Sequence, residues 1–407
     1  MTSKTNRLTS NLSIEQNLLI TSGREASAAM KPVYLDYNAT TPLDPRVFEA
    51  MRPYYSTVVG NAGSRTHIYG HKAKEAVERA RAQVASLIGA EAKEIVFTSG
   101  ATESNNLALL GLIPYGSDCR RRHLLATCIE HKSVLAPLDK LGALGCEVEL
   151  VPVTRGGFVE PDAIFHRLRR DTLLVSMMHA NNETGVLQPI HEVSRLLAGS
   201  GVLLHVDAAQ SFGKEVEALR QAEYDFLSIS SHKIYGPAGV GALYVRRSRS
   251  RRIPLQPLMV GGGQEMGLRP GTLPVSLIVG LGRAAELAGQ EHKQRRDQAE
   301  GVKGKFLHAL QSVDHRINGD LTRMQPHVVN VSFPGVDSEA LMLALRIELA
   351  ISSGAACTSS GHLVSHVLGS MGLPQEQLDS AVRLSWGPGI KEIPHEVLFK
   401  AVARLRC

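Results

Sequence analysis

Short runs of hydrophobic residues alternate along the middle of the chain with stretches whose apolar positions recur every three or four residues. Strands buried on both faces of a parallel sheet read as near-continuous apolar runs, and the intervening period is that of helices. The pattern therefore predicts an α/β fold with a buried, mostly parallel sheet. The expected strands are 94–98, 173–178, 202–206 and 226–230, and the expected first long helix is 75–87.

The two ends of the chain differ from this central pattern. Residues 1–30 are rich in Ser, Thr and Asn, lack the apolar core of a secretory signal and mix Glu with Arg, so we expect a disordered extension without a targeting role. Residues 279–311 are helical and charged, and an extended run at 328–333 follows. This part predicts a smaller α+β unit appended to the first.

Composition narrows the class of protein. With 43% hydrophobic and 21% charged residues and no uninterrupted apolar run of about 18 residues, the chain reads as a cytoplasmic globular protein that does not enter membranes. Its cysteines are odd in number and contain no Cys-x-x-Cys pair, which argues against a disulfide framework or a zinc site. The cysteines are Cys119, Cys128, Cys146, Cys357 and Cys407.

The net charge of +6 permits acidic partners without requiring them. The arginine-rich stretch 246–252 is either a solvated loop or a dock for an acidic acceptor protein or nucleic acid. Because no aromatic residues are interleaved with these arginines, we infer no direct binding of nucleic acid.

A turn between a strand and a helix supplies candidate phosphate donors. The strand at 94–98 leads through Ser99 and Gly100 into a helix that opens with Ala101 and Thr102. A glycine turn at a helix N-terminus can cradle a phosphate with backbone N–H groups. The alternative is an ordinary strand-to-helix turn with a polar cap.

Two further strand ends carry residues suited to pyridoxal 5'-phosphate (PLP). Asp207 can pair with the pyridinium nitrogen, and Gln210 can donate to the phenolic oxygen, although a helix N-cap also explains an aspartate here. Lys233 can form the Schiff base with the cofactor, while Ser230 and His232 add phosphate donors. An isolated lysine is usually a solvated surface residue, but the apolar strand before Lys233 disfavours that reading.

Five segments together carry a family resemblance. The chain resembles the cysteine desulfurases of the NifS/IscS type, in the class V aminotransferase family of fold-type I PLP enzymes, over about residues 32–390. The resemblance implies a large domain with a mostly parallel seven-stranded sheet and a smaller α+β domain. It places the large, PLP-binding domain at 43–290 and the small domain at 31–42 and 291–407. The segments are 34–42, 97–104, 178–185, 205–210 and 231–237.

The resemblance also implies roles for individual residues. His131 would stack on the pyridine ring and serve in acid–base steps, and Asn182 would bond the phenolic oxygen or the substrate. Arg383 would grip the substrate carboxylate, for which a bidentate guanidinium is suited. Thr272 would reach the phosphate of the partner subunit's cofactor, which implies a homodimer with composite active sites.

Cys357 is the candidate sulfur carrier. It lies among small Gly, Ala and Ser residues that offer access and conformational freedom, and the resemblance places it on a loop of the small domain. Its thiolate would take the sulfur of L-cysteine as a persulfide and leave alanine, whereas we expect Cys128 and Cys146 to be inert.

Several alternatives stay open at this level. The same fold and cofactor would serve a selenocysteine lyase or another aminotransferase-like reaction, and a third reading is a sulfur-relay scaffold. The sulfur acceptor could belong to Fe–S cluster assembly, tRNA thiolation or DNA phosphorothioation.

Overall fold

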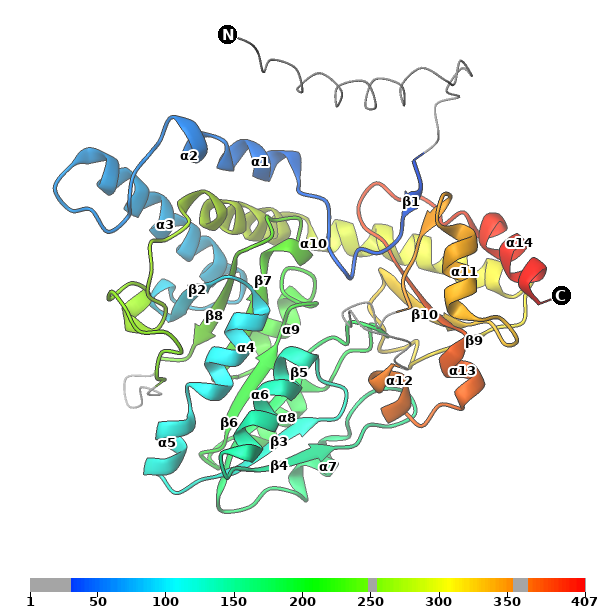
Figure 1. The fold of residues 1–407 in the computed structure, drawn as a ribbon, viewed down its shortest axis with the longest axis horizontal. Helices are drawn as coiled ribbons and strands as arrows, with labels where there is room; N and C mark the ends of the chain where they lie inside the picture. Colours follow the sequence, from blue (N-terminus) through cyan, green and yellow to red (C-terminus); the bar gives the residue numbers. More distant parts are fainter. Residues whose placement is uncertain (1–30, 248–254, 354–364, 407) are drawn as a thin grey trace, which may run out of the picture.

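The computed structural model describes residues 31–247, 255–353 and 365–406. Its central element is a seven-stranded sheet of order β2-β8-β7-β6-β5-β3-β4, in which only β8 runs antiparallel to its neighbours (Figure 1). The predicted α/β class with a mostly parallel sheet is confirmed. The strands are β2 (Ile95–Thr98), β3 (His123–Thr127), β4 (Glu147–Val151), β5 (Thr172–Met178), β6 (Leu203–Asp207), β7 (Phe226–Ser230) and β8 (Gly241–Val245).

Helices cover both faces of this sheet, which explains why its strands are apolar at nearly every position. Leu204 packs into the core on one face and its neighbour Leu203 into the core on the other, because successive side chains of a strand point to opposite faces. The first core takes side chains from α1 (Pro45–Met51), α3 (Ile68–Leu87), α7 (Pro161–Phe165), α8 (Ile190–Leu197), α9 (Val216–Gln221) and α10 (Val275–Leu310). The second takes them from α4 (Ala101–Leu110) and α6 (Lys132–Ala143), with α5 (Ile113–Asp118) beside them.

Helix α10 has 36 residues and is about 54 Å long, so it extends from the large sheet to the C-terminal region (Figure 1). It packs closely on α3, and a Cβ at Gly282 would lie 2.6 Å from the Ala80 Cα. The expected helix at 75–87 was too short, because Ile68 and Tyr69 in its first turn are exposed and interrupt the apolar stripe. The helix α2 (Pro53–Ser56) precedes it.

Two small sheets form the C-terminal region. An antiparallel sheet has the order β12-β10-β9, and β1 pairs in parallel with β11, which attaches the N-terminal segment here. A separate core joins Leu35, Phe306, Val331 and Leu384. The elements are β1 (Val33–Tyr34), β9 (Arg316–Ile317), β10 (Val328–Ser332), β11 (Leu349–Ala350), β12 (Ala381–Ser385), α11 (Ser338–Leu345), α12 (His366–Ser370), α13 (Gln375–Asp379) and α14 (His395–Leu405). The exact division of the chain into two domains stays a prediction.

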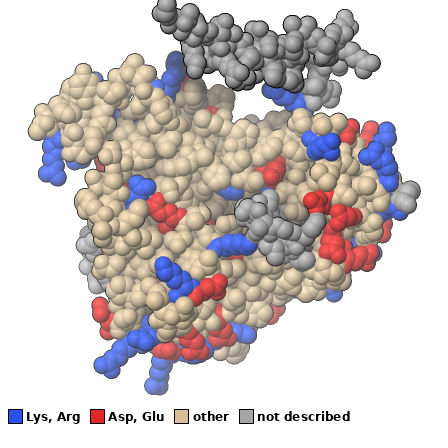
Figure 2. Space-filling view, in the orientation of Figure 1, with Lys and Arg blue, Asp and Glu red and all other residues tan. Residues whose placement is uncertain are grey.

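The surface carries both signs of charge. On the face shown in Figure 2, basic and acidic side chains are interspersed, and acidic ones gather over the C-terminal elements at the right. Within the described ranges, no helix combines the length and the apolar character needed to cross a bilayer.

Candidate active site

The candidate site lies where several strands end. β3, β5, β6 and β7 are parallel, so their carboxyl ends reach the same edge of the sheet, and small molecules bind at this edge in α/β folds. A cavity of about 390 Å³ opens there, a volume within the usual range of small-molecule sites.

The fold brings most of the predicted site residues into this one cavity. Thr272 is exposed and lies outside the cavity lining, and Cys357 lies outside the described residues. The predicted residues that line the cavity are Ala101, Thr102, His131, Asn182, Asp207, Gln210, Ser230, His232, Lys233 and Arg383.

One end of the cavity is rich in phosphate donors. The first N–H groups of α4 have no acceptor within the helix, and the segment Ser99–Thr102 lines the cavity. Gly241 permits the turn, since a Cβ there would lie 2.6 Å from the Gly100 Cα. Burial, together with the charge of Lys233, lowers the pKa of His232 to about 4, so this imidazole is neutral at pH 7.

Asp207 is held at the end of β6 by two hydrogen bonds. The Ala209 N–H donates to Oδ1 at 2.9 Å, and Asn105 Nδ2 donates to Oδ2 at 2.7 Å. Asn105 Nδ2 also donates to Ser133 Oγ at 2.8 Å, and that oxygen lies 2.7 Å from Nδ1 of His131. A polar chain therefore connects the carboxylate with the imidazole of His131.

Sequence reasoning missed Asn105 and Ser133. Asn105 is fully buried, and it follows Ala101 by one helical turn on the face of α4 that is turned toward the cavity. The available signal was an amide side chain among the apolar positions of a helix, because a buried polar group requires a partner.

Lys233 lies in a short 3-10 turn directly after β7. Its Nζ donates to the carbonyl oxygen of Ala39 at 2.7 Å and also to that of Asn38. Gln210 Nε2 donates to the same Asn38 oxygen at 2.8 Å. The N-terminal segment thus closes over the lysine, a contribution for which the sequence analysis assigned no residue.

Arg383 reaches the cavity from β12 in the C-terminal region. Its guanidinium donates to the Asn182 carbonyl oxygen at 2.8 Å and to Asp36 Oδ1 at 2.6 Å. The Nε atom is buried and has no hydrogen-bond partner among the described residues. Two contacts therefore fix the group, while Nε–H and two further N–H donors, which these contacts do not use, could bind a ligand.

Two buried acids lie beneath the cavity. Burial raises the pKa of Glu130 to about 8, against the hydrogen bonds that its Oε1 accepts from Thr127 and from the Met178 N–H. Burial also raises the pKa of Glu183, whose Oε2 accepts a hydrogen bond from Ser365 Oγ at 2.5 Å. The Glu130 carboxyl group is therefore held largely protonated near neutral pH, and the pKa of Glu183 is shifted in the same direction.

The described cysteines and acids offer no competing centre. Cys119, Cys128 and Cys146 are free thiols outside the cavity lining, and burial raises the pKa of Cys146. Across the described ranges, no group of three or more His, Cys, Asp or Glu side chains is arranged to hold a metal ion.

The arrangement fits PLP. The cavity combines donors for a phosphate, a carboxylate for a pyridinium nitrogen and a primary amine for a carbonyl carbon. A Cβ at Gly100 would meet nothing within 4 Å, so the space next to the phosphate donors is open.

Comparison with known proteins agrees with this site. The model of the family Aminotransferase class-V matches residues 33–388. The cysteine desulfurase IscS of Rickettsia bellii (strain OSU 85-389) is 45% identical over 88% of this chain and 86% of its own length. The IscS of Anaeromyxobacter dehalogenans (strain 2CP-C) is 48% identical over 88% of both chains.

Solved structures with a similar fold come from proteins of the same kind. A NifS-like protein superposes with a TM-score of 0.82 at 36% identity, over 92% of this chain and 98% of its own. DndA from Streptomyces lividans superposes with a TM-score of 0.77 at 47% identity, over 86% of this chain and 98% of its own. The chain therefore belongs to the class V aminotransferase family, whose members depend on PLP, and within it to the cysteine desulfurases of the NifS/IscS type.

Proposed function

We propose that this protein is a PLP-dependent L-cysteine desulfurase that converts L-cysteine and the Cys357 thiol into L-alanine and a Cys357 persulfide. The sulfur atom leaves the substrate Cβ and bonds to Cys357 Sγ, and the thiol proton of Cys357 is conserved in the products. The observation that carries the proposal is the convergence of Lys233, Asp207 and Arg383 on one cavity in a chain of this family.

The cofactor would be held by the residues already described. Ser99–Thr102, Ser230 and His232 would bind the phosphate, Asp207 the ring nitrogen, and Lys233 the aldehyde carbon, with His131 against the ring. When bound, PLP supplies an electron sink for negative charge that develops at the substrate Cα.

Lys233 would move the proton at the substrate Cα. Its amine lies at the mouth of β7, and the carbonyl oxygens of Asn38 and Ala39 fix its direction. A primary amine positioned within hydrogen-bond reach of a carbon acid can act as general base and then as general acid.

Arg383 would orient the substrate. Its free Nε–H and the remaining guanidinium donors can bind a carboxylate, while Asp36 and the Asn182 carbonyl keep the group in one rotamer. Once its carboxylate is fixed, the substrate would present its Cα–H bond to Lys233, and its thiol would be available to Cys357.

The acceptor of the sulfur is proposed to be a protein. A thiol of an acceptor protein can take the outer sulfur of the Cys357 persulfide by exchange, which regenerates the Cys357 thiol.

The homodimer is likewise a proposal, supported by the exposed apolar side chains of Leu258, Met259 and Val260 and by the exposure of Thr272. Sedimentation of the holoenzyme would measure its mass.

The Cys357→Ala variant tests the central step. With ³⁵S-labelled L-cysteine, the wild-type protein should acquire label that a reductant releases, and it should produce alanine. Cys357→Ala should acquire no label and release no sulfide, whereas the control Cys146→Ala should behave as the wild type. Sulfide release from Cys357→Ala at the wild-type rate would instead favour a lyase without a cysteine carrier.

A further inference from the structure

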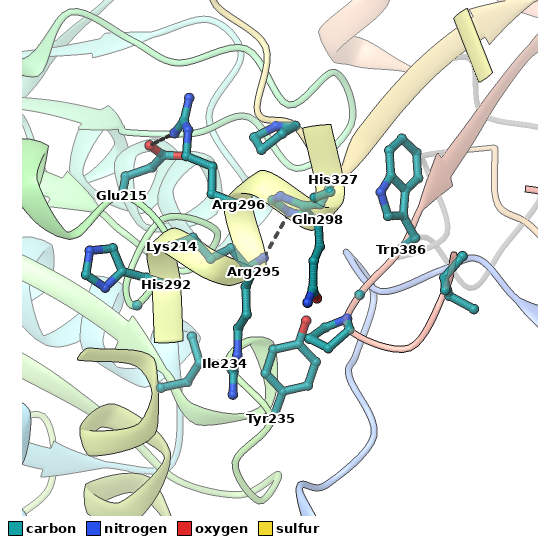
Figure 3. Close-up of a pocket in the computed structure, with 16 residues that line it drawn as sticks. Lys214, Glu215, Ile234, Tyr235, His292, Arg295, Arg296, Gln298, His327 and Trp386 are labelled. Carbon is teal, nitrogen blue, oxygen red and sulfur yellow. Dashed lines mark hydrogen bonds and ion pairs between the residues drawn. The ribbon is translucent and has the colours of Figure 1, made fainter. Parts of the chain in front are cut away.

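A second pocket adjoins the cofactor cavity. It lies between α10 and the segments that flank strands β10 and β12 of the C-terminal sheet. It has a volume of about 50 Å³ and is lined by Lys214, His327 and Trp386 among others (Figure 3). Lys214 comes from the segment after β6, His327 directly precedes β10, and Trp386 directly follows β12. The pocket thus lies where the large sheet meets the C-terminal region.

Lys214 makes two contacts with uncharged groups. Its Nζ lies 3.1 Å from Nε2 of His327, a contact drawn in Figure 3, and it donates to Gln210 Oε1 at 3.4 Å. Burial and the charge of Lys214 hold the pKa of His327 well below its usual value, so the imidazole is neutral and accepts from the lysine. No carboxylate of a described residue forms an ion pair with Lys214, because neighbouring Glu215 is bonded to Arg296.

Gln210 connects this pocket with the cofactor cavity. Its Oε1 accepts from Lys214, and its Nε2 donates to the Asn38 carbonyl oxygen, which also accepts from Lys233. An amide has one acceptor end and one donor end, so both contacts select the same orientation of the side chain. If the amide were rotated by half a turn, its N–H groups would face the Lys214 ammonium and its oxygen would face the Asn38 oxygen.

We propose that Lys214 is a positioning residue of the cofactor site, which fixes the Gln210 amide with its N–H end at the cavity and places a positive charge behind it. The inference rests on the proposed PLP function, because the fixed N–H group would serve the phenolic oxygen of that cofactor. Lys214 itself does not line the cofactor cavity.

The energetics argue against a purely structural role. Burial, and secondly the charge of Lys233, lowers the pKa of Lys214 to about 7. A lysine whose pKa is lower in the folded state than in the unfolded state destabilises the fold at neutral and acidic pH. A residue that opposes stability yet connects to the active-site lysine is expected to serve the site.

Besides burial, several charged groups around Lys214 influence its pKa. Lys233 and Arg383 act from the cavity side, and Glu215 is its neighbour in sequence. The ionisable residues that line the pocket with it are Glu215, Tyr235, His292, Arg295, Arg296 and His327.

Lys303 offers a matched control on α10. It is also buried, and burial lowers its pKa to about 8, but its Nζ donates only to the backbone oxygens of Met324 and Gln325 among the described contacts. Lys303→Met therefore removes a similar buried charge without touching Gln210.

The experiment compares the holoenzymes of wild type, Lys214→Met, Lys214→Arg and Lys303→Met. The visible absorption band of the bound cofactor is recorded from pH 6 to 9, together with kcat, KM and thermal unfolding. We expect the wild-type band to change near pH 7 and Lys214→Met to lose that change, with kcat about 10-fold lower after loss of one hydrogen bond to the Gln210 amide. Lys214→Arg keeps the charge and the donors but does not titrate near pH 7, so its kcat should stay closer to the wild type while its band also loses the change near pH 7.

Stability separates the positioning role from a structural one. Lys214→Met should unfold at the same or a higher temperature than the wild type at pH 6 to 7. This advantage should shrink as the pH rises from about 7 toward 10.5, because the folded state then loses the proton that the unfolded state still keeps. A Lys214→Met band that matches the wild type, or an equal change in Lys303→Met, would overturn the inference. A wild-type protein that binds no PLP would instead contradict the proposed function.

Discussion

The two walls of the cavity are built in different ways. The wall that carries Asp207 and Lys233 consists of neighbouring strand ends of one sheet, so the ladder of β6 and β7 sets the spacing of its backbone. The opposite wall joins Arg383 of β12 to Asp36 and Asn182, which are distant in sequence. The backbone of the first wall comes from one sheet, whereas the second wall forms only when the N-terminal segment, the large sheet and the C-terminal sheet dock together.

This difference assigns different tasks to the two walls. In the proposed function, residues of the sheet wall hold the cofactor and move protons, and a rigid sheet keeps such groups aligned. Residues of the docked wall are proposed to recognise the substrate, and their geometry depends on long-range contacts. Substitutions in the first wall should therefore lower kcat, and substitutions in the second should raise KM.

Loss of Lys233 should have the largest effect. Lys233→Ala removes both the amine that anchors the cofactor and the proposed base, so activity should fall by at least about 10³-fold. Alanine formation from L-cysteine measures the loss, and Lys132→Ala, at an exposed lysine beside His131, serves as the control. Activity within 10-fold of the wild type would contradict the role of the sheet wall.

Arg383→Ala tests the docked wall. Removing a charged pair of hydrogen bonds to a carboxylate should raise the KM for L-cysteine by about 10- to 100-fold. The kcat should change less, because Lys233 and Asp207 lie on the other wall. Steady-state kinetics distinguish the two parameters. Arg323→Ala, whose guanidinium lies over the Phe158 ring away from the cavity, should leave both unchanged.

Asn105→Ala probes the support behind the sheet wall. It leaves Asp207 Oδ2 and Ser133 without their shared donor, and an unsatisfied buried group costs about 1–3 kcal/mol. We expect a lower unfolding temperature and weaker retention of PLP, with the KM for L-cysteine little changed. Asn106→Ala alters the next residue on the same helix, whose amide donates to the Thr102 carbonyl, and provides the comparison. Equal effects of the two substitutions would show that the network does not support Asp207.

Glu130→Gln should have the smallest effect on activity, and its main effect should be on the pH dependence of stability. The raised pKa of about 8 means that the folded state keeps a proton that the unfolded state loses above about pH 4.5. Wild-type stability therefore decreases between these two values, and the glutamine variant removes this decrease. Thermal unfolding should show equal midpoints near pH 4.5 and a higher midpoint for the variant at pH 8. A difference that does not depend on pH would contradict protonated Glu130.

Local sequence patterns predicted most of the sheet wall. The run of apolar residues that ends at Asp207 predicted a buried strand, and the following run predicted the position of Lys233. Parallel strands place their carboxyl ends at one edge, so the cofactor residues could be inferred to lie together without knowledge of any long-range contact. The helix boundaries were less accurate where the first turn is exposed, as at Ile68.

The family resemblance went further and predicted that Arg383 binds the substrate, but it did not identify the contacts that hold its guanidinium in the cavity. The contacts of Asp36 with Arg383, of Asn105 with Asp207 and of Lys214 with His327 were not predicted, because no local period encodes a partner that lies 100 or more residues away. The cavity role of Cys357 rests on its sequence alone, since it lies outside the described residues.

The sequence by itself therefore determined the α/β class, the family and the residues at the strand ends, because local hydrophobic period and short motifs carry that information. Only the tertiary structure decided which polar groups support them. Contacts between Arg383 and Asp36, between Asn105 and Asp207, and between Lys214 and His327 require the packed elements to bring buried groups within bonding distance.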